Sequence, residues 1–155
     1  MRPVHVFIAL CLALAGALQA NAQDKVPDWT VTIEDFHGGS GVTYTHIITP
    51  KSIRTVQTTD NEDDKPIELN KLDLSKQQLA SIREVLNRVP LDKLKKTYQP
   101  ETPLLGGSVA FTFELPEREK KEVLVWQGAR VRSLKRVVDK VNTILPEKYR
   151  IRAMD

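Results

Sequence analysis

Apolar and polar positions alternate in the first half of the chain as half-buried strands require. From Trp29 to Glu34 every second residue is apolar, and Val42 to Thr49 and Ile53 to Thr58 are rich in residues that favour extended backbone. Turns are expected at the glycine-rich stretch before Val42 and at Pro50. The pattern predicts a hairpin of two strands and a third strand after Pro50.

The first helix is marked at both of its ends. Ser75 is placed as the N-cap with Gln78 three residues later, the spacing of a capping box, and Leu74 and Leu79 flank the cap as a hydrophobic staple does. Pro90 ends the helix, because proline lacks a backbone donor. The apolar stripe recurs at helical spacing and consists of Leu79, Ile82, Val85, Leu86 and Val89.

The last third of the chain again shows a hairpin followed by a helix. Val109 to Leu115 alternates strictly, Pro116 to Lys121 is a charged turn, and Glu122 to Trp126 is the expected partner strand. A second helix is predicted from Ser133 to Leu145, where Pro146 ends it. The residues expected on its buried face are Leu134, Val137, Val138, Val141, Ile144 and Leu145.

Together these elements predict an α+β domain in the order ββ(β)αββα. Short hairpin connections favour an antiparallel sheet of four to five strands, and two amphipathic helices of this length are expected to pack on one face of it. Between the elements, the acidic stretch at about 59–70 is predicted to be a solvated loop, and Leu91 to Tyr98 a short helical turn.

The N-terminus has the composition of a secretory signal peptide. Arg2 precedes an apolar run from Val6 to Leu18, which is shorter than the roughly 20 residues of a membrane span, and Ala20-Asn21-Ala22 matches a signal peptidase site. We therefore expect a signal peptide at residues 1–22 and a single domain at residues 23–155. The domain is expected to be periplasmic or secreted, with no transmembrane segment after cleavage.

Cysteine usage and charge narrow the chemistry. Cys11, the only cysteine, lies inside the apolar run and follows Leu10, so it does not match a lipidation site. It would leave with the signal peptide, which excludes disulfides, thiolate catalysis and cysteine-based zinc sites from the exported domain. The net charge of +3 is too small to indicate a nucleic-acid partner.

The stretch His37-Gly38-Gly39-Ser40-Gly41 is the best candidate for contact with a partner. Its first residues are similar to an esterase oxyanion loop, but that site needs a G-x-S-x-G nucleophile, which the sequence lacks. We expect a flexible hairpin loop whose glycines permit positive φ and close approach of a partner to the backbone.

His37 and His46 are the histidines that remain after cleavage. Either could serve a small hydrolase if it met an acid in a cleft, although His46 is expected on a partly polar surface of the sheet. Two histidines across a hairpin fall short of the ligands that zinc needs. We therefore expect no metal, no cofactor and no catalytic residue.

The acidic stretch also allows a calcium hypothesis. Asp60, Glu62 and Asp64 stand at alternate positions, but an EF-hand would then need glycine and glutamate where the chain has Lys65 and Lys71. A solvated acidic loop is the simpler interpretation.

The second helix and the residues before it are basic. From Pro116 to the end the chain has eleven Lys and Arg against six Asp and Glu. Such a surface can attract an acidic partner or an anionic envelope surface, and it is also typical of the solvated side of a helix. The residues concerned are Arg130, Arg132, Lys135, Arg136 and Lys140.

One family has the same layout. The segments 37–41, 74–78, 109–115 and 134–145 resemble, in order, the Gly-Gly hairpin, capped helix, strand and final helix of the emfourins, which are small protein inhibitors of thermolysin-like metalloproteases. The resemblance implies inhibitor activity and no particular site residue. We predict an exported, non-enzymatic domain that binds a protein or an envelope component. A protease inhibitor and a small hydrolase using His37 or His46 are the alternatives.

Overall fold

The structure is a computed structural model that describes residues 29–61, 63–102 and 106–151. The strands are β1 (Thr30–His37), β2 (Val42–Ile48), β3 (Ser52–Thr59), β4 (Ile67–Asp73), β5 (Thr97–Tyr98), β6 (Ser108–Glu114) and β7 (Lys121–Trp126), and the helices are α1 (Lys76–Asn87) and α2 (Arg132–Asn142). The α+β class is confirmed, and the sheet has more strands than the four to five expected. The predicted signal peptide at residues 1–22, including Cys11, lies outside the described residues.

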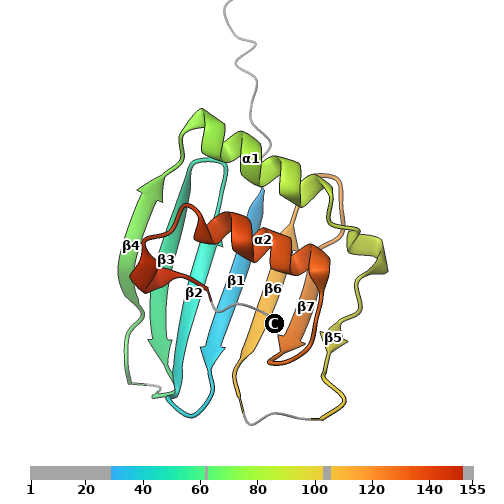
Figure 1. The fold of residues 1–155 in the computed structure, drawn as a ribbon. Coiled ribbons are helices and arrows are strands. Elements are labelled where there is room, and N and C mark those ends of the chain that lie inside the picture. The colour runs from blue at the N-terminus through green and yellow to red at the C-terminus, as the bar shows by residue number, and fades with distance from the viewer. Residues whose placement is uncertain (1–28, 62, 103–105, 152–155) are drawn as a thin grey trace, which may run out of the picture.

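The seven strands form one sheet in the order β4-β3-β2-β1-β6-β7-β5 (Figure 1). All neighbours are antiparallel except β5 and β7, which run parallel. Phe36 pairs with Ser108 at one end of the central strands, and Thr30 pairs with Glu114 at the other. We call the first end, where β1 leads into the glycine-rich stretch, the glycine end, and the second the Trp29 end.

The two faces of the sheet differ because alternate residues of a strand point to opposite sides. On one face Val31, Ile33 and Phe111 are completely buried and belong to one core with residues of both helices. Figure 1 shows both helices crossing this side of the sheet. No described helix crosses the opposite side, which carries Thr32, Glu34 and the residues paired with them. We call it the open face.

α1 begins as the sequence predicts. Ser75 Oγ accepts a hydrogen bond from the Gln78 backbone N–H at 3.2 Å, and Gln78 Oε1 accepts one from the Ser75 N–H at 2.9 Å, which completes the capping box. Ile82 and Leu86 are buried in the core, and the helix ends ahead of Pro90.

Replacing Ser75 by alanine is expected to lower the free energy of unfolding by about 1 kcal/mol, because the Gln78 N–H loses its acceptor. Urea denaturation measures the effect. Ser81→Ala is the matched control, since the Ser81 hydroxyl donates to the Gln78 carbonyl inside the helix and alanine is the better helix former. An equal loss in both variants would contradict the capping role.

α2 begins at Arg132 rather than Ser133 and ends at Asn142 rather than Leu145. The end is tightened at Thr143, whose N–H donates to the carbonyls of both Asp139 and Lys140 at 3.2 Å. The predicted buried face is confirmed for Leu134, Val137, Val138, Val141 and Leu145, and Ile144 is partly buried against the same core.

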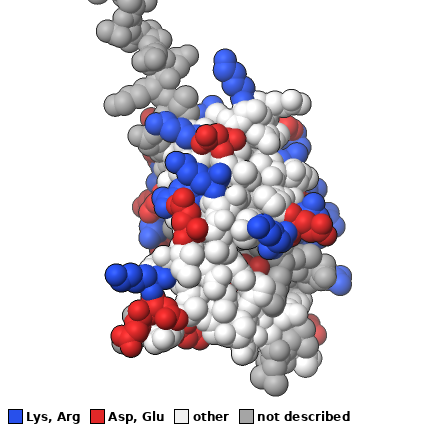
Figure 2. All heavy atoms as spheres, turned by 90° about the vertical axis from the view of Figure 1, so that its left-hand side faces the viewer, with Lys and Arg blue, Asp and Glu red and all other residues white. Residues whose placement is uncertain are grey.

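The solvated loop predicted at about 59–70 is wrong in its second part, where the chain forms β4 at an edge of the sheet. A β-bulge shifts the register between β3 and β4, and most residues of β4 are exposed or half-buried, so no simple alternation marks the strand. Two contacts fasten it: the Tyr149 hydroxyl donates to the Leu69 carbonyl at 3.1 Å, and Arg54 pairs with Glu68 at 2.6 Å. Figure 2 views the molecule from this edge.

The helical turn predicted at Leu91–Tyr98 is confirmed only for Leu91–Lys93, which forms a 3-10 turn. Thr97 and Tyr98 instead form β5, which pairs with Leu124 and Val125 of β7. A strand of two residues is too short to show a period in the sequence.

The turn between β6 and β7 contains a strained residue. The Arg118 N–H donates to the Leu115 carbonyl at 3.3 Å, Pro116 occupies the next position, and Glu117 has a φ of 58°. This is the pattern of a type II turn, whose third position favours glycine.

Glu117→Gly is expected to raise the free energy of unfolding by about 0.5–1 kcal/mol, because the relief of a left-handed non-glycine residue exceeds the added flexibility of the unfolded chain. Thermal denaturation measures the effect. Glu119→Gly is the control, since Glu119 does not have a positive φ and glycine there should destabilise the fold. A loss of stability in Glu117→Gly would contradict the prediction.

Candidate functional site

The glycine-rich stretch forms the turn between β1 and β2, as the pattern predicts. Ser40 closes the turn: its backbone N–H and its Oγ donate to the His37 carbonyl at 3.2 and 2.8 Å, and its Oγ accepts from the Val42 N–H at 3.3 Å. Gly38, Gly39 and Ser40 are exposed. The turn is thus closed by hydrogen bonds of its own residues.

All three glycines of this turn are constrained, Gly41 because its φ is 64°. Gly39 has a φ of 84°, which L side chains rarely adopt, and no described atom would lie within 4 Å of a Cβ there. Gly38 lies against the start of β6, where a Cβ on it would be 2.8 Å from the carbonyl carbon of Gly106. The turn therefore projects at Gly39 and is anchored at Gly38.

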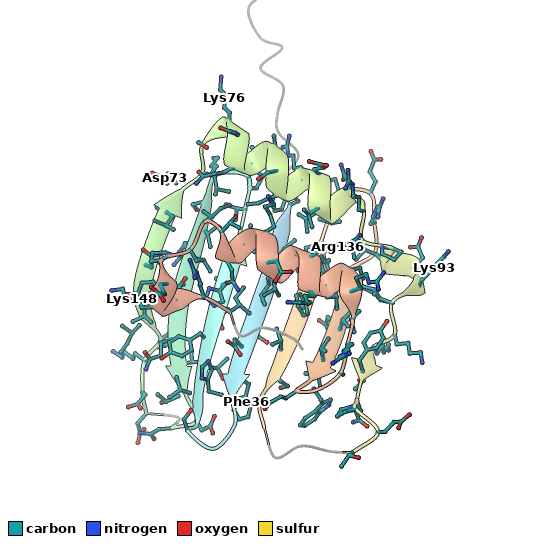
Figure 3. The ribbon with its side chains drawn as sticks, in the orientation of Figure 1. Phe36, Asp73, Lys76, Lys93, Arg136 and Lys148 are labelled. Atoms are coloured by element: carbon teal, nitrogen blue, oxygen red, sulfur yellow. The ribbon has the colours of Figure 1, made fainter. Side chains whose placement is uncertain are left out.

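Beside the turn, the open face ends in a row of side chains that crosses five strands. In order of their pairing the residues are Trp126 of β7, Ser108 of β6, Phe36 of β1, Thr43 of β2 and Thr58 of β3. Trp126 is 39% exposed, and Figure 3 shows Phe36 at the glycine end of β1. We call this row together with the turn at 38–41 the loop-end surface.

Trp126 and Phe36 were not among the predicted site residues. Phe36 is an aromatic residue at a position that alternation assigns to the polar side of β1, after Thr32 and Glu34. Trp126, in contrast, ends an apolar run from Val123 that shows no alternation. The mismatch at Phe36 was visible in the sequence. The pairing that brings the two residues into one row was not, because it depends on the strand order.

Beyond this row, the open face carries both acidic and basic side chains and does not select a ligand of one charge. A shallow hollow of about 840 Å³ lies over β1, β6 and β7, and its lining includes Glu34, Lys96, Lys120 and Glu122. Lys120 Nζ is 2.8 Å from Glu122 Oε1, and this hydrogen bond raises the pKa of Lys120 and lowers the pKa of Glu122. With Lys121 the lining has three lysines against two glutamates, so most but not all of the charge in the hollow is offset.

The two histidines do not come together. His37 pairs with Val42 and His46 pairs with Ile33, so the two rings lie roughly 13 Å apart along the sheet at about 3.3 Å per residue. His46 is 1% exposed, and the prediction of a polar sheet surface for it is wrong, because it shares the helix-covered side of β2 with Ile48. Its Nδ1 lies 3.2 Å from Thr55 Oγ1.

Burial also changes the ionisation of His46. Removal from water lowers its pKa from 6.5 to about 4, a shift that the nearby Asp35 carboxylate opposes. The ring is therefore neutral at pH 7 and is out of reach of a substrate. Its role is that of a hydrogen-bonded core residue.

His37 is partly exposed and pairs with a buried acid. Its Nε2 lies 3.3 Å from Asp35 Oδ2, and its ring packs edge-on against Tyr44 with 5.1 Å between ring centroids. A carboxylate that orients a histidine is one component of a hydrolytic site. Ser40, the nearest hydroxyl in sequence, donates instead to the His37 backbone. The pair therefore anchors the base of the turn.

The predicted basic surface is only partly free of acids. Arg130, Arg132 and Arg136 are exposed, and Figure 3 labels Arg136 on α2. Lys135 Nζ pairs with Asp139 at 3.2 Å. A hollow of about 360 Å³ between α1 and α2 includes Arg136 and Lys140 in its lining, but Asp139 as well. The structure thus gives this surface a moderate positive charge.

The acidic stretch stays exposed at Asp60, Asp63 and Asp64. Figure 2 shows acidic side chains gathered toward the lower end of the molecule. Asp64 Oδ2 accepts a hydrogen bond from the Thr59 hydroxyl at 2.6 Å. Among the described residues, no three His, Cys, Asp or Glu side chains gather as a metal ion would require.

No model of a known protein family matches the chain, and no curated protein is similar to it. In the part of the chain that the structure describes, no helix has both the length and the apolar character needed to cross a membrane. A function must therefore be inferred from the fold and from the surfaces described above.

Proposed function

We propose that the protein is an exported, non-enzymatic domain that binds another protein through the loop-end surface. The observation that carries the proposal is the position of a hydrogen-bonded, projecting turn beside an aromatic row on a sheet face that no described helix covers. A few residues supply most of the binding energy of a protein interface, and tryptophan is enriched among them. A turn that is ordered by its own hydrogen bonds loses less entropy when it binds than an unordered one does.

The loop-end surface fits a protein partner better than the two other surfaces do. The hollow on the open face has mostly offsetting charges, and the groove between the helices is shallow and polar. The loop-end surface combines an exposed indole, hydroxyl groups and accessible backbone at Gly39. When a partner covers this surface, the indole becomes part of a buried apolar centre with hydrogen-bonding groups around it. This is the usual anatomy of protein interfaces.

Trp126→Ala is expected to weaken partner binding about 30-fold or more, because a tryptophan that acts as an interface hot spot contributes about 2 kcal/mol. The partner is first captured from the envelope fraction of the native host, and its affinity is measured by calorimetry. Thr112→Ala, on the open face but away from the row, is the control and should change the affinity little.

The salt dependence of the affinity and two double variants show whether the interface is the loop-end surface or the basic helix α2. Affinity should change little between 0.1 M and 1 M salt, over which the Debye length falls from about 10 to about 3 Å. His37→Ala with Ser40→Ala should weaken binding, and Arg132→Ala with Arg136→Ala should not. Strong salt dependence with an effect from the arginine pair alone would move the interface to α2 and overturn the proposal.

Inhibition of a metalloprotease is a second candidate, which the emfourin resemblance implies. The projecting turn supports it, since an inhibitor must present a segment that is already held in shape. The test is hydrolysis of a peptide substrate by thermolysin in the presence of the purified protein. Inhibition that Gly39→Val abolishes would establish this activity, and full protease activity at a large excess of the protein would exclude thermolysin as a target.

A further inference from the structure

A third hollow lies at the Trp29 end of the sheet, away from the loop-end surface. Its volume is about 240 Å³, and it is formed between α1 and the turn that joins β6 to β7. Trp29, Leu86 and Leu115 supply apolar walls, and Arg83 and Arg118 supply positive charge. Figure 1 shows this turn rising beside α1.

Arg83 has an unsatisfied donor. Its Nη2 is buried and has no hydrogen-bond partner among the described residues. A buried donor without an acceptor destabilises the folded protein, and more so when it belongs to a guanidinium group. Native proteins rarely leave such a group unpaired, so we expect its acceptor to lie outside the described residues, as a water molecule or a bound group.

The surroundings of Arg83 specify what that acceptor is. The described residues that line the hollow include two arginines and no acid. Glu84, the neighbouring acid on α1, is engaged with Arg88 at 2.6 Å. An excess of guanidinium groups without a counter-charge attracts an anion, and the planar fork of arginine matches a carboxylate.

The walls narrow the choice among anions. Trp29 and Leu86 are buried core residues that reach the hollow, and Leu115 packs partly against the same core. An anion with an apolar group would remove these side chains from water while its charged end hydrogen-bonds to Arg83. Phosphate would leave the same side chains exposed to water. The turn that contains Arg118 also contains Glu117, whose backbone has a positive φ. Such backbone strain is concentrated at functional sites.

We propose that this hollow binds a carboxylate carried on an apolar group, such as the end or an acidic side chain of a polypeptide, with Arg83 and Arg118 as its partners. The proposal is independent of the loop-end surface, because the two sites lie at opposite ends of the sheet.

Fluorescence of Trp29 provides the test. The chain has two tryptophans, so in a Trp126→Phe background the emission reports on the hollow alone. The purified protein is titrated with N-acetyl-leucine, with N-acetyl-leucinamide and with inorganic phosphate. We expect a saturable change with the acid and binding about ten-fold weaker or absent with the amide, since a charged hydrogen bond is lost.

Matched arginine variants identify the partner. Arg83→Gln should weaken binding of the acid about ten-fold or more, and Arg88→Gln, on the same helix but paired with Glu84, should leave it unchanged. Circular dichroism checks that each variant is folded, and Arg118→Gln provides the same test if Arg83→Gln does not fold. Equal effects of acid and amide, tighter binding of phosphate, or equal behaviour of the Arg83 and Arg88 variants would overturn the proposal.

A further arm identifies the source of the carboxylate. Residues 23–28 directly precede Trp29 and include Asp24 and Asp28. If this segment occupies the hollow, Asp24→Asn with Asp28→Asn should tighten binding of N-acetyl-leucine. If another molecule supplies the group, the double variant should bind it as the parent does. Both results require a carboxylate site at Arg83.

Discussion

Replacing Leu134 by alanine is expected to lower the free energy of unfolding by about 2–5 kcal/mol, because it removes buried methyl groups and leaves a cavity that the fold fills only in part. Leu134 is 0% exposed and lies on α2 in the core that also contains Ile82 of α1 and Phe111 of β6. Domains are typically stable by about 5–15 kcal/mol, so this one change removes a large part of the total. Urea denaturation at pH 7 measures it.

The same helix provides the controls. Arg136→Ala changes an exposed position and should stay within about 0.5 kcal/mol of the parent. Val138→Ala, also at 0% exposure, removes fewer methyl groups and should fall between the two. Equal stability of Leu134→Ala and Arg136→Ala would mean that α2 does not cover the sheet as described.

The protein is expected to lose about 3 kcal/mol of stability between pH 6.5 and pH 4 through His46 alone, since each unit of pKa shift corresponds to about 1.4 kcal/mol. Above pH 6.5 this histidine is neutral in both the folded and the unfolded chain. As the pH falls toward 4, the unfolded chain takes up a proton that the folded protein excludes. The free energy of unfolding therefore falls with pH over this window and levels off below it.

Urea denaturation across the pH window isolates the contribution of His46. His46→Gln keeps a polar side chain beside Thr55 and should remove the His46 part of the slope, whereas His37→Gln should retain it. Carboxylates also titrate toward pH 4, but they do so in all three proteins. An unchanged slope in His46→Gln would show that the ring is hydrated in the folded state.

The sequence predicted the elements whose pattern is local. The capping box at Ser75, the buried stripe of α2 and the alternation of β6 each depend on residues within one element. β4 escaped prediction because it is an exposed edge strand with a bulge and charged residues, and β5 because two residues have no period. His46 and Ile48 are two residues apart on β2, so their side chains lie on the same side of the sheet. His46 could be placed in the core only once that side was known to be covered by the helices.

The candidate site was predictable only in part, for the same physical reason. The turn at 38–41 could be recognised from its own residues. Its neighbours Phe36 and Trp126 join it through the order of β1, β6 and β7, which hydrophobic periodicity does not encode. The unpaired guanidinium of Arg83 lies further beyond prediction, since it results from packing between α1 and a turn distant in sequence.

The contacts along β4 affect the tendency of this protein to aggregate through the edge of its sheet. An open strand edge is a template onto which a second chain can add, and repeated addition leads to fibrils. Here the Tyr149 hydroxyl occupies the Leu69 carbonyl, the bulge breaks the regular spacing, and the ion pair of Arg54 with Glu68 places charge beside the edge. At the opposite edge only two residues of β5 are paired. Neither edge therefore offers a long, regular row of free backbone groups. We expect that a second molecule does not extend the sheet.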